Sequence, residues 1–260
     1  MSTTTTDAVI VTLEQVHGTV MILAWIVFAS AGILFARYGR RIRFGDTSKL
    51  FGADIWFQMH RSIVILAAIT ILVGLIIILA KGENESVQRN RDEQRVKAHS
   101  ALGFIVIGCT LLQVVMGLFR CGPQSAHRFI FNWIHRTVGI LAFILSIPTL
   151  FLITSVLKTY LTGLMIILSL WAGWIAIIVI VLEIIQYRSR SNSSTIGTKM
   201  ENGKDGQELN DGKLERVPSG SKNMKPEPRN YNNLTLSLFI LNLIVAIGLA
   251  IPLIVLIWQQ

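Results

Sequence analysis

Residues 60–80 read HRSIVILAAITILVGLIIILA, a histidine and an arginine followed by an apolar run without any further charge. Five more apolar runs, nearly free of charge over their middles, lie at 17–37, 99–119, 132–154, 161–186 and 234–258. Each is near the roughly 20 residues that an α-helix needs to cross the hydrocarbon core of a bilayer. The sequence therefore predicts an all-α integral membrane protein with six transmembrane helices.

The overall composition points the same way. Of the 260 residues, 52% are hydrophobic and only 15% are charged, which is too apolar for an ordinary soluble domain. The net charge of +9 is concentrated between the apolar runs. It therefore reports on membrane orientation, and we expect no nucleic-acid partner.

The segments between the runs predict the domain organisation. Residues 187–233 are rich in Ser, Asn, Lys, Glu and Pro and offer almost nothing to bury, a composition typical of disorder. We therefore expect a short N-terminus at 1–16, a five-helix domain at 17–190, a disordered linker at 191–233 and a sixth transmembrane helix at 234–260.

Lysine and arginine predict the orientation. If the helices alternate in direction, the segments 38–59, 120–131 and 187–233 share one side. That side carries 18 of the 24 basic residues when Arg37, Arg61 and Arg136 at the adjoining helix ends are counted. Cytoplasmic segments of membrane proteins carry an excess of Lys and Arg. This side is therefore predicted to be cytoplasmic, and the N-terminus non-cytoplasmic.

Four of the five histidines open the first four runs: His17, His60, His99 and His135. Neutral imidazole is a common axial ligand of haem iron, and ionisable groups in membrane segments tend to mark function. Alternating helix direction places His17 and His99 at the outer face, and the other two at the cytoplasmic face. In an antiparallel four-helix bundle each pair is diagonal and can clamp a flat macrocycle. The first four helices are therefore predicted to bind two b-type haems, whereas His127 is expected to be a solvated loop residue.

A different dihaem architecture does not fit. Cytochromes b that oxidise quinol carry two ligand histidines on each of two helices, separated by the depth of the membrane. No apolar run of this chain has a second histidine near its far end.

Small residues accompany three of the four histidines. Gly18 directly follows the first, while Gly103 and Gly139 each lie four residues after theirs. Positions i and i+4 share one helix face, so a glycine there would let a flat ring approach the backbone. Ordinary packing of small residues between helices is the alternative.

Short motifs around these histidines resemble the cytochrome b561 domain. The second run is entered by Leu50-Phe51-Gly52 and by Trp56-Phe57-Gln58-Met59-His60-Arg61. The other matching motifs are His17-Gly18, Ala24-Trp25 and Ala36-Arg37-Tyr38 for the first helix, Phe131-Asn132-Trp133-Ile134-His135 for the fourth, and Trp174, Glu183 and Tyr187 for the fifth. The similarity covers about residues 13–190 and is closest to the ferric-chelate reductase branch, whose members also carry DOMON and reeler modules.

The resemblance implies two b haems on the same ligand pairs, cytoplasmic ascorbate as electron donor, and ferric chelate or monodehydroascorbate as outer acceptor. It thus implies an ascorbate-dependent transmembrane oxidoreductase of the plasma membrane or an endomembrane vesicle, and it leaves a homodimer open. About twelve residues precede the first helix. DOMON and reeler modules are therefore expected to be missing, in a stand-alone form or in an incomplete gene product.

Basic residues next to the histidines are candidates for holding anions. Arg61 and Arg136 directly follow the two cytoplasmic-side histidines, and Arg95 and Lys97 precede His99. Guanidinium groups bind carboxylates and enolates in a bidentate fashion, so they could hold haem propionates, ascorbate or a ferric chelate. Anchoring to lipid headgroups is the alternative.

Two other functions remain open at this point. One is a haem-binding membrane sensor or scaffold without turnover, with residues 187–233 as its partner site. The other is a haem-free transporter or receptor with interfacial histidines, although transporters usually carry polar residues or broken helices at the membrane midplane.

Overall fold

The computed structural model describes residues 12–42, 49–50, 53–80, 90–119, 125–157, 159–204 and 229–259. Within these ranges, six helical spans are long and apolar enough to cross a membrane. They coincide with the six apolar runs, so the predicted all-α membrane fold is confirmed.

The first span, Leu13–Tyr38, has three consecutive parts: α1 (Leu13–Ile22), the π-helical η1 (Leu23–Ala29) and α2 (Ser30–Tyr38). A short 3-10 turn, η2 (Gly39–Arg41), follows it. The remaining helices are α3 (Ile55–Ala80), α4 (Asn90–Leu118), α5 (Arg128–Thr154), α6 (Leu161–Lys204) and α7 (Arg229–Trp258). Two short strands, β1 (Lys49–Leu50) and β2 (Ala53–Asp54), pair antiparallel before α3.

Helix α1 begins four residues before the predicted boundary at residue 17, because Thr12 caps it. The Thr12 side chain accepts a hydrogen bond from the backbone N–H of Gln15 (3.3 Å), and the Gln15 side chain accepts one from the backbone N–H of Thr12 (3.1 Å). This reciprocal capping box satisfies two amide donors that the first helical turn leaves open.

The predicted linker at 191–233 overlaps two helices. Helix α6 continues to Lys204 and α7 begins at Arg229. The part at 205–228 lies outside the described residues, so its disorder stays a prediction.

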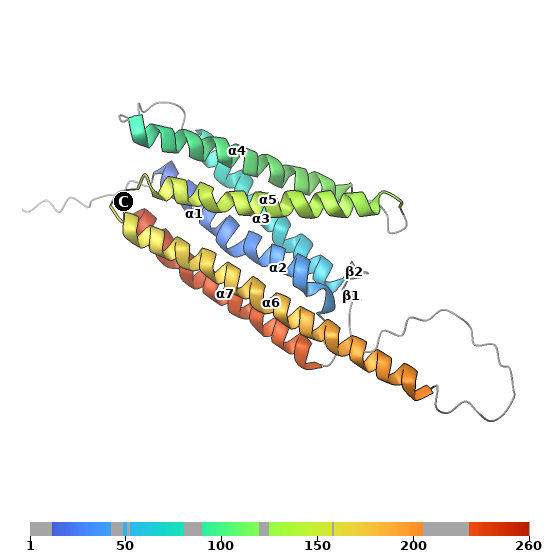
Figure 1. The fold of residues 1–260 in the computed structure, drawn as a ribbon. Coiled ribbons are helices and arrows are strands. Elements are labelled where there is room, and N and C mark those ends of the chain that lie inside the picture. Colours follow the sequence, from blue (N-terminus) through green and yellow to red (C-terminus); the bar gives the residue numbers. More distant parts are fainter. Residues whose placement is uncertain are drawn as a thin grey trace, which may run out of the picture.

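The helices lie side by side along one long axis (Figure 1). Helices α4 and α5 pack on each other on one side of the first span, and α6 and α7 pack on each other on the other side, while α3 packs along the first span itself. The first span is the most enclosed of the six spans, and α4 is the least. The outer face of α4 presents exposed apolar side chains, among them Phe104, Ile105 and Leu112, as expected for a surface in contact with lipid.

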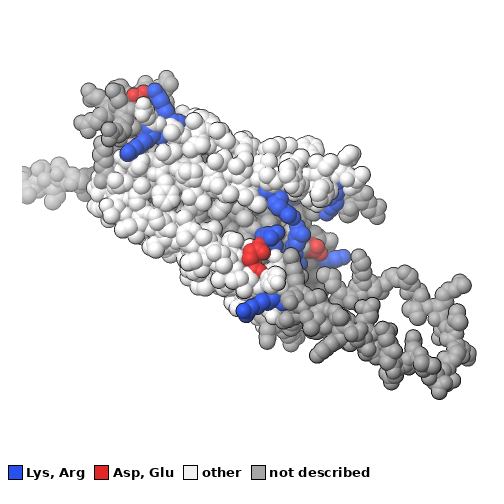
Figure 2. Space-filling model, viewed as in Figure 1, with Lys and Arg blue, Asp and Glu red and all other residues white. Residues whose placement is uncertain are grey.

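Charged side chains gather near the two ends of the bundle on the face shown in Figure 2, with an uncharged band between them. This separation is the one that a hydrocarbon core with polar interfaces on both sides demands. The uncharged band therefore corresponds to the hydrocarbon core, and its two borders correspond to the membrane interfaces.

Candidate functional site

The four histidines that open the first four spans meet in two pairs. The His17 pair consists of His17 on α1 and His99 on α4, whose ring centroids lie 6.4 Å apart with an angle of 85° between the ring planes. The His60 pair consists of His60 on α3 and His135 on α5, at 6.5 Å and 87°. These are the two pairs that alternating helix direction places at equal depth. His127 lies exposed just before α5 and belongs to neither pair.

Both pairs have the spacing of two ligands on opposite sides of one metal. Two imidazole nitrogens about 2 Å from a shared metal put the ring centroids roughly 6 Å apart. The described residues contain no group of three or more His, Cys, Asp or Glu side chains that could hold a metal ion. Two axial ligands suffice when a macrocycle supplies the other four, so the donor set fits haem.

The outer nitrogen of three of these histidines is bonded to a backbone carbonyl on a neighbouring helix. The bonds join Nδ1 of His17 to Gly74 O (2.8 Å), Nδ1 of His60 to Gly32 O (2.9 Å) and Nδ1 of His99 to Thr149 O (2.9 Å). A carbonyl oxygen can only accept, so Nδ1 carries the hydrogen and donates. The lone pair is then on Nε2, and such a bond also orients the ring and raises the basicity of the ligand nitrogen.

Glycine at two of the acceptor positions permits close contact between the first span and α3. A Cβ atom on Gly32 would lie 2.7 Å from Cγ1 of Val64, and one on Gly74 would lie 2.8 Å from Cε of Met21. At Gly32 the neighbouring atom belongs to a stiff β-branched side chain, so only a residue without a side chain lets the two backbones approach this closely, whereas the Met21 tip at Gly74 is flexible. The carbonyls of Gly32, Gly74 and Thr149 were not predicted from the sequence.

A repeated spacing places these acceptors. On α3 and α5 the acceptor lies fourteen residues after the histidine of its own helix, at Gly74 and Thr149. Fourteen α-helical residues make about 3.9 turns, so histidine and acceptor share one face. On the first span the spacing from His17 to Gly32 is fifteen. The π-helical η1 lies between them, and a π-helix absorbs one additional residue without changing the face that follows.

The family model for eukaryotic cytochrome b561 matches residues 16–158, more than half of the chain, and contains all four paired histidines. This chain belongs to the cytochrome b561 family. The resemblance read from the sequence motifs is thereby confirmed.

Several ferric-chelate reductases are relatives of this b561 chain. A putative ferric-chelate reductase 1 from Xenopus laevis is 34% identical over 138 residues, which cover 53% of this chain and 22% of the relative. A putative homolog from Drosophila melanogaster is 32% identical over 173 residues (66% and 24%), and ferric-chelate reductase 1 from Homo sapiens is 28% identical over 142 (55% and 22%). This chain thus spans less than a quarter of these relatives. No solved structure matches it.

The predicted glycines lie in three different settings. In this b561 chain, a Cβ atom on Gly18 would lie 3.3 Å from Cδ1 of Ile257 on α7, so Gly18 allows close packing of α1 on α7. One on Gly139 would lie 3.4 Å from Oε1 of Gln113 on α4. A Cβ atom on Gly103 would meet no described atom within 4 Å, which leaves open space one turn after His99.

The predicted basic residues are held close to the histidine pairs. Arg61, exposed beside His60, donates to the Gln58 side chain (2.6 Å) and lies over the ring of Phe57. Arg136 is exposed beside His135.

At the His17 pair, the basic candidates have protein partners. Arg95 donates to the carbonyl of Ser155 at the end of α5 (3.0 Å). Lys97 forms an ion pair with Glu93 one turn earlier (2.6 Å).

A network at the His60 end joins the first span to α6. Arg37 donates from Nη2 to Oε1 of Glu183 (2.8 Å), and the Tyr38 hydroxyl donates to the same oxygen (2.9 Å). The b561 motifs contain all three residues, but nothing in the sequence predicted this contact across 146 positions. The network ties the end of α2 to the fifth span, close to the layer of the His60 pair.

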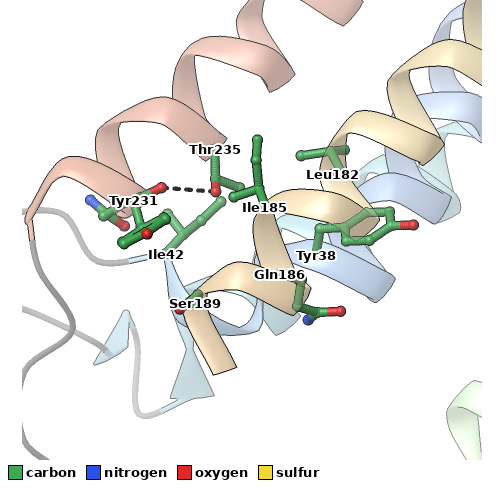
Figure 3. A pocket seen from close by; sticks show the side chains of 9 residues that line it. Tyr38, Ile42, Leu182, Ile185, Gln186, Ser189, Tyr231 and Thr235 are labelled. Atoms are coloured by element: carbon green, nitrogen blue, oxygen red, sulfur yellow. Dashed lines mark hydrogen bonds between the residues drawn. The ribbon is translucent and has the colours of Figure 1, made fainter. Parts of the chain in front are cut away.

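A small cavity lies next to this network, between Tyr38, α6 and the beginning of α7 (Figure 3). Its volume is about 30 Å³, and Gln186 and Thr235 contribute polar groups to its wall. A cavity of this size holds about two ordered water molecules. It is too small to hold an organic molecule.

Proposed function

We propose that this chain carries electrons across its membrane through two b haems, one on each histidine pair. The observation that supports the proposal most is the ring-centroid spacing of 6.4 Å and 6.5 Å at the two ends of one bundle. Haem, when bound, supplies a one-electron redox centre. The chain's contribution is to orient the imidazoles, to separate the two layers and to exclude water between them.

The two layers divide the width of the membrane. The fourteen residues from His60 to Gly74 on α3 run from one layer to the other and correspond to about 21 Å along a helix. The residues midway between the layers are buried on each of the four helices: Trp25, Ala67, Val106 and Ala142. Packed side chains at this level would keep water away from the space between the two centres.

The proposed donor is cytoplasmic ascorbate, at the end of the His60 pair. The orientation rests on the excess of Lys and Arg at that end. Ascorbate is an anionic enolate at neutral pH, and the exposed guanidinium groups of Arg61 and Arg136 suit such a ligand or a haem propionate. Outward transfer of one electron from a negative interior is favourable by about 2.3 kcal/mol per 100 mV.

The proposed outer acceptor is a ferric chelate, with monodehydroascorbate as the alternative. The names of the relatives support the former, because several are called ferric-chelate reductases. A plasma membrane or an endomembrane vesicle would each supply ascorbate on one side and an acceptor on the other.

Haem content is the decisive test. Purified, folded protein should contain two haems per chain in a pyridine haemochrome assay, and alanine at His127, the exposed fifth histidine, should leave that number unchanged. Folded protein with no haem would refute the proposal and leave a transporter or receptor as the function.

Electron transfer is tested separately in vesicles. Protein reconstituted around trapped ascorbate should reduce an external ferric chelate, and alanine at His60 should stop this reduction. Two bound haems without any transfer from ascorbate would favour the haem-binding sensor or scaffold.

A further inference from the structure

The helix pair α4–α5 repeats the arrangement of the first span and α3, with one difference. His99 on α4 is bonded to the carbonyl of Thr149 on α5. Fourteen residues along α4 from His99 is Gln113, and fourteen residues back along α5 from Thr149 is His135. Because the two helices are antiparallel neighbours, equal steps in opposite sequence directions keep the two positions face to face. Gln113 therefore occupies, for His135, the place that Thr149 occupies for His99.

The Gln113 side chain lies inside the interface between α4 and α5. Its Oε1 atom is 3.4 Å, and its amide carbon 3.6 Å, from the place of a Cβ atom on Gly139, one helical turn after His135. Its Nε2 atom is buried and has no hydrogen-bond partner among the described residues. The Nδ1 atom of His135 is buried as well. A buried amide within a membrane span is costly unless it serves a bond.

We infer that Gln113 is a positioning residue for His135, and that its side-chain oxygen accepts the Nδ1–H of this histidine when His135 is a haem ligand. The inference rests on the haem pair His60/His135 of the proposed function. The other three histidines donate to backbone carbonyls. A substitution of the accepting residue leaves its carbonyl in place. At the fourth the acceptor is a side chain, so a single substitution can remove it.

The consequence is a difference between the two haem sites. A hydrogen-bond acceptor on Nδ1–H makes the ligand nitrogen more basic, which favours the oxidised iron and lowers its midpoint potential. The Gln113 amide thus adjusts the potential of the haem at the His60 pair without affecting the other one.

Two variants of similar length test this role. Gln113→Met fills the same space without a strong acceptor, whereas Gln113→Glu keeps an oxygen at the same place. Thr110→Val is the control, because the Thr110 hydroxyl, one turn away on α4, donates to the carbonyl of Val106 in its own helix and to no other described residue. The measurement is a redox titration of purified, haem-loaded protein, in which each haem gives one wave, together with the haem count.

Gln113→Met is expected to move one wave to higher potential and to leave the other in place. Gln113→Glu should keep that wave at, or below, its wild-type potential, and Thr110→Val should move neither. The role is supported equally if Gln113→Met loses one haem while Gln113→Glu retains both. Two bound haems with both waves unmoved in Gln113→Met would overturn it, as would the same upward shift or haem loss in both variants. Wild-type protein with fewer than two haems would instead count against the proposed function.

Discussion

Replacing Gly32 with alanine should weaken the haem site at the His60 pair. The Cβ atom would lie 2.7 Å from Cγ1 of Val64, whereas ordinary contacts begin at 3.4 Å, so α3 must move away by about 0.7 Å. Val64 is a stiff β-branched residue that cannot turn aside at little cost. Since His60 lies one turn before Val64, the shift lengthens its bond to the Gly32 carbonyl from 2.9 Å to about 3.6 Å, where no hydrogen bond remains.

The cost has two parts. Overpacking of this kind destabilises a protein by about 1–3 kcal/mol. Loss of a hydrogen bond behind a metal-binding histidine lowers the affinity for the metal group by roughly 10- to 100-fold. We therefore expect haem at the His60 pair to dissociate at least about tenfold faster, and haem at the His17 pair to be unchanged.

The assay is the transfer of haem from the purified protein to an excess of a haem-free globin. Gly74→Ala is the matched variant, because Gly74 accepts the hydrogen bond from His17. Its Cβ atom would meet the flexible tip of Met21 at 2.8 Å, so haem release from the His17 pair should increase less. Gly173→Ala on α6, where a Cβ atom would meet no described atom within 4 Å, should change the release of neither haem. Wild-type dissociation of both haems from Gly32→Ala would refute the reasoning.

Three further predictions concern pairing, helix register and orientation. Alanine at His60 or His135 should remove one and the same haem, and the double variant should lose no more, whereas adding His99→Ala should remove the second; loss of both haems from a folded His60/His135 double variant would contradict this. Deleting Val27 from η1 should restore a spacing of fourteen and retain both haems, whereas deleting Leu66 turns the two ends of α3 about 100° apart and should cost at least one haem; equal haem content in both deletions would show that register is unimportant. A protease site inserted at 205–228 should be cut only from the cytoplasmic face, and cutting from outside intact cells would reverse the assigned orientation.

Much of the architecture could be predicted because it depends on length and order alone. A run such as 60–80 is long enough to span a bilayer and too apolar for anything else. Alternating direction then sorts the histidines by depth, so that His17 and His99 belong to one face without any knowledge of packing. The helix ends were predicted less accurately than the spans. Helix α1 begins after a capping box at Thr12, which the hydropathy of the apolar run does not indicate.

The groups that accept hydrogen bonds from the paired histidines could not be predicted from the sequence. Every residue has the same backbone carbonyl, so nothing marks Gly32, Gly74 or Thr149 as acceptors until two helices are set in register. The contact of Arg37 with Glu183 depends in the same way on how α2 lies against α6. A glycine or a polar residue fourteen positions after a histidine on the same helix is the signal that could have pointed to two of these acceptors, Gly74 and Thr149.

By itself, then, the sequence determined that this chain is a six-span membrane protein, which histidines share a depth, and the family to which it belongs. These properties follow from hydrophobic length, chain direction and local motifs, which are all features of the linear sequence. Only the tertiary structure decided that the paired rings lie 6.4 Å and 6.5 Å apart, and which groups stand behind them. Distances of this kind depend on how closely two helices approach and how they are rotated. Side-chain volume at the contact sets both, as it does where Gly32 meets Val64.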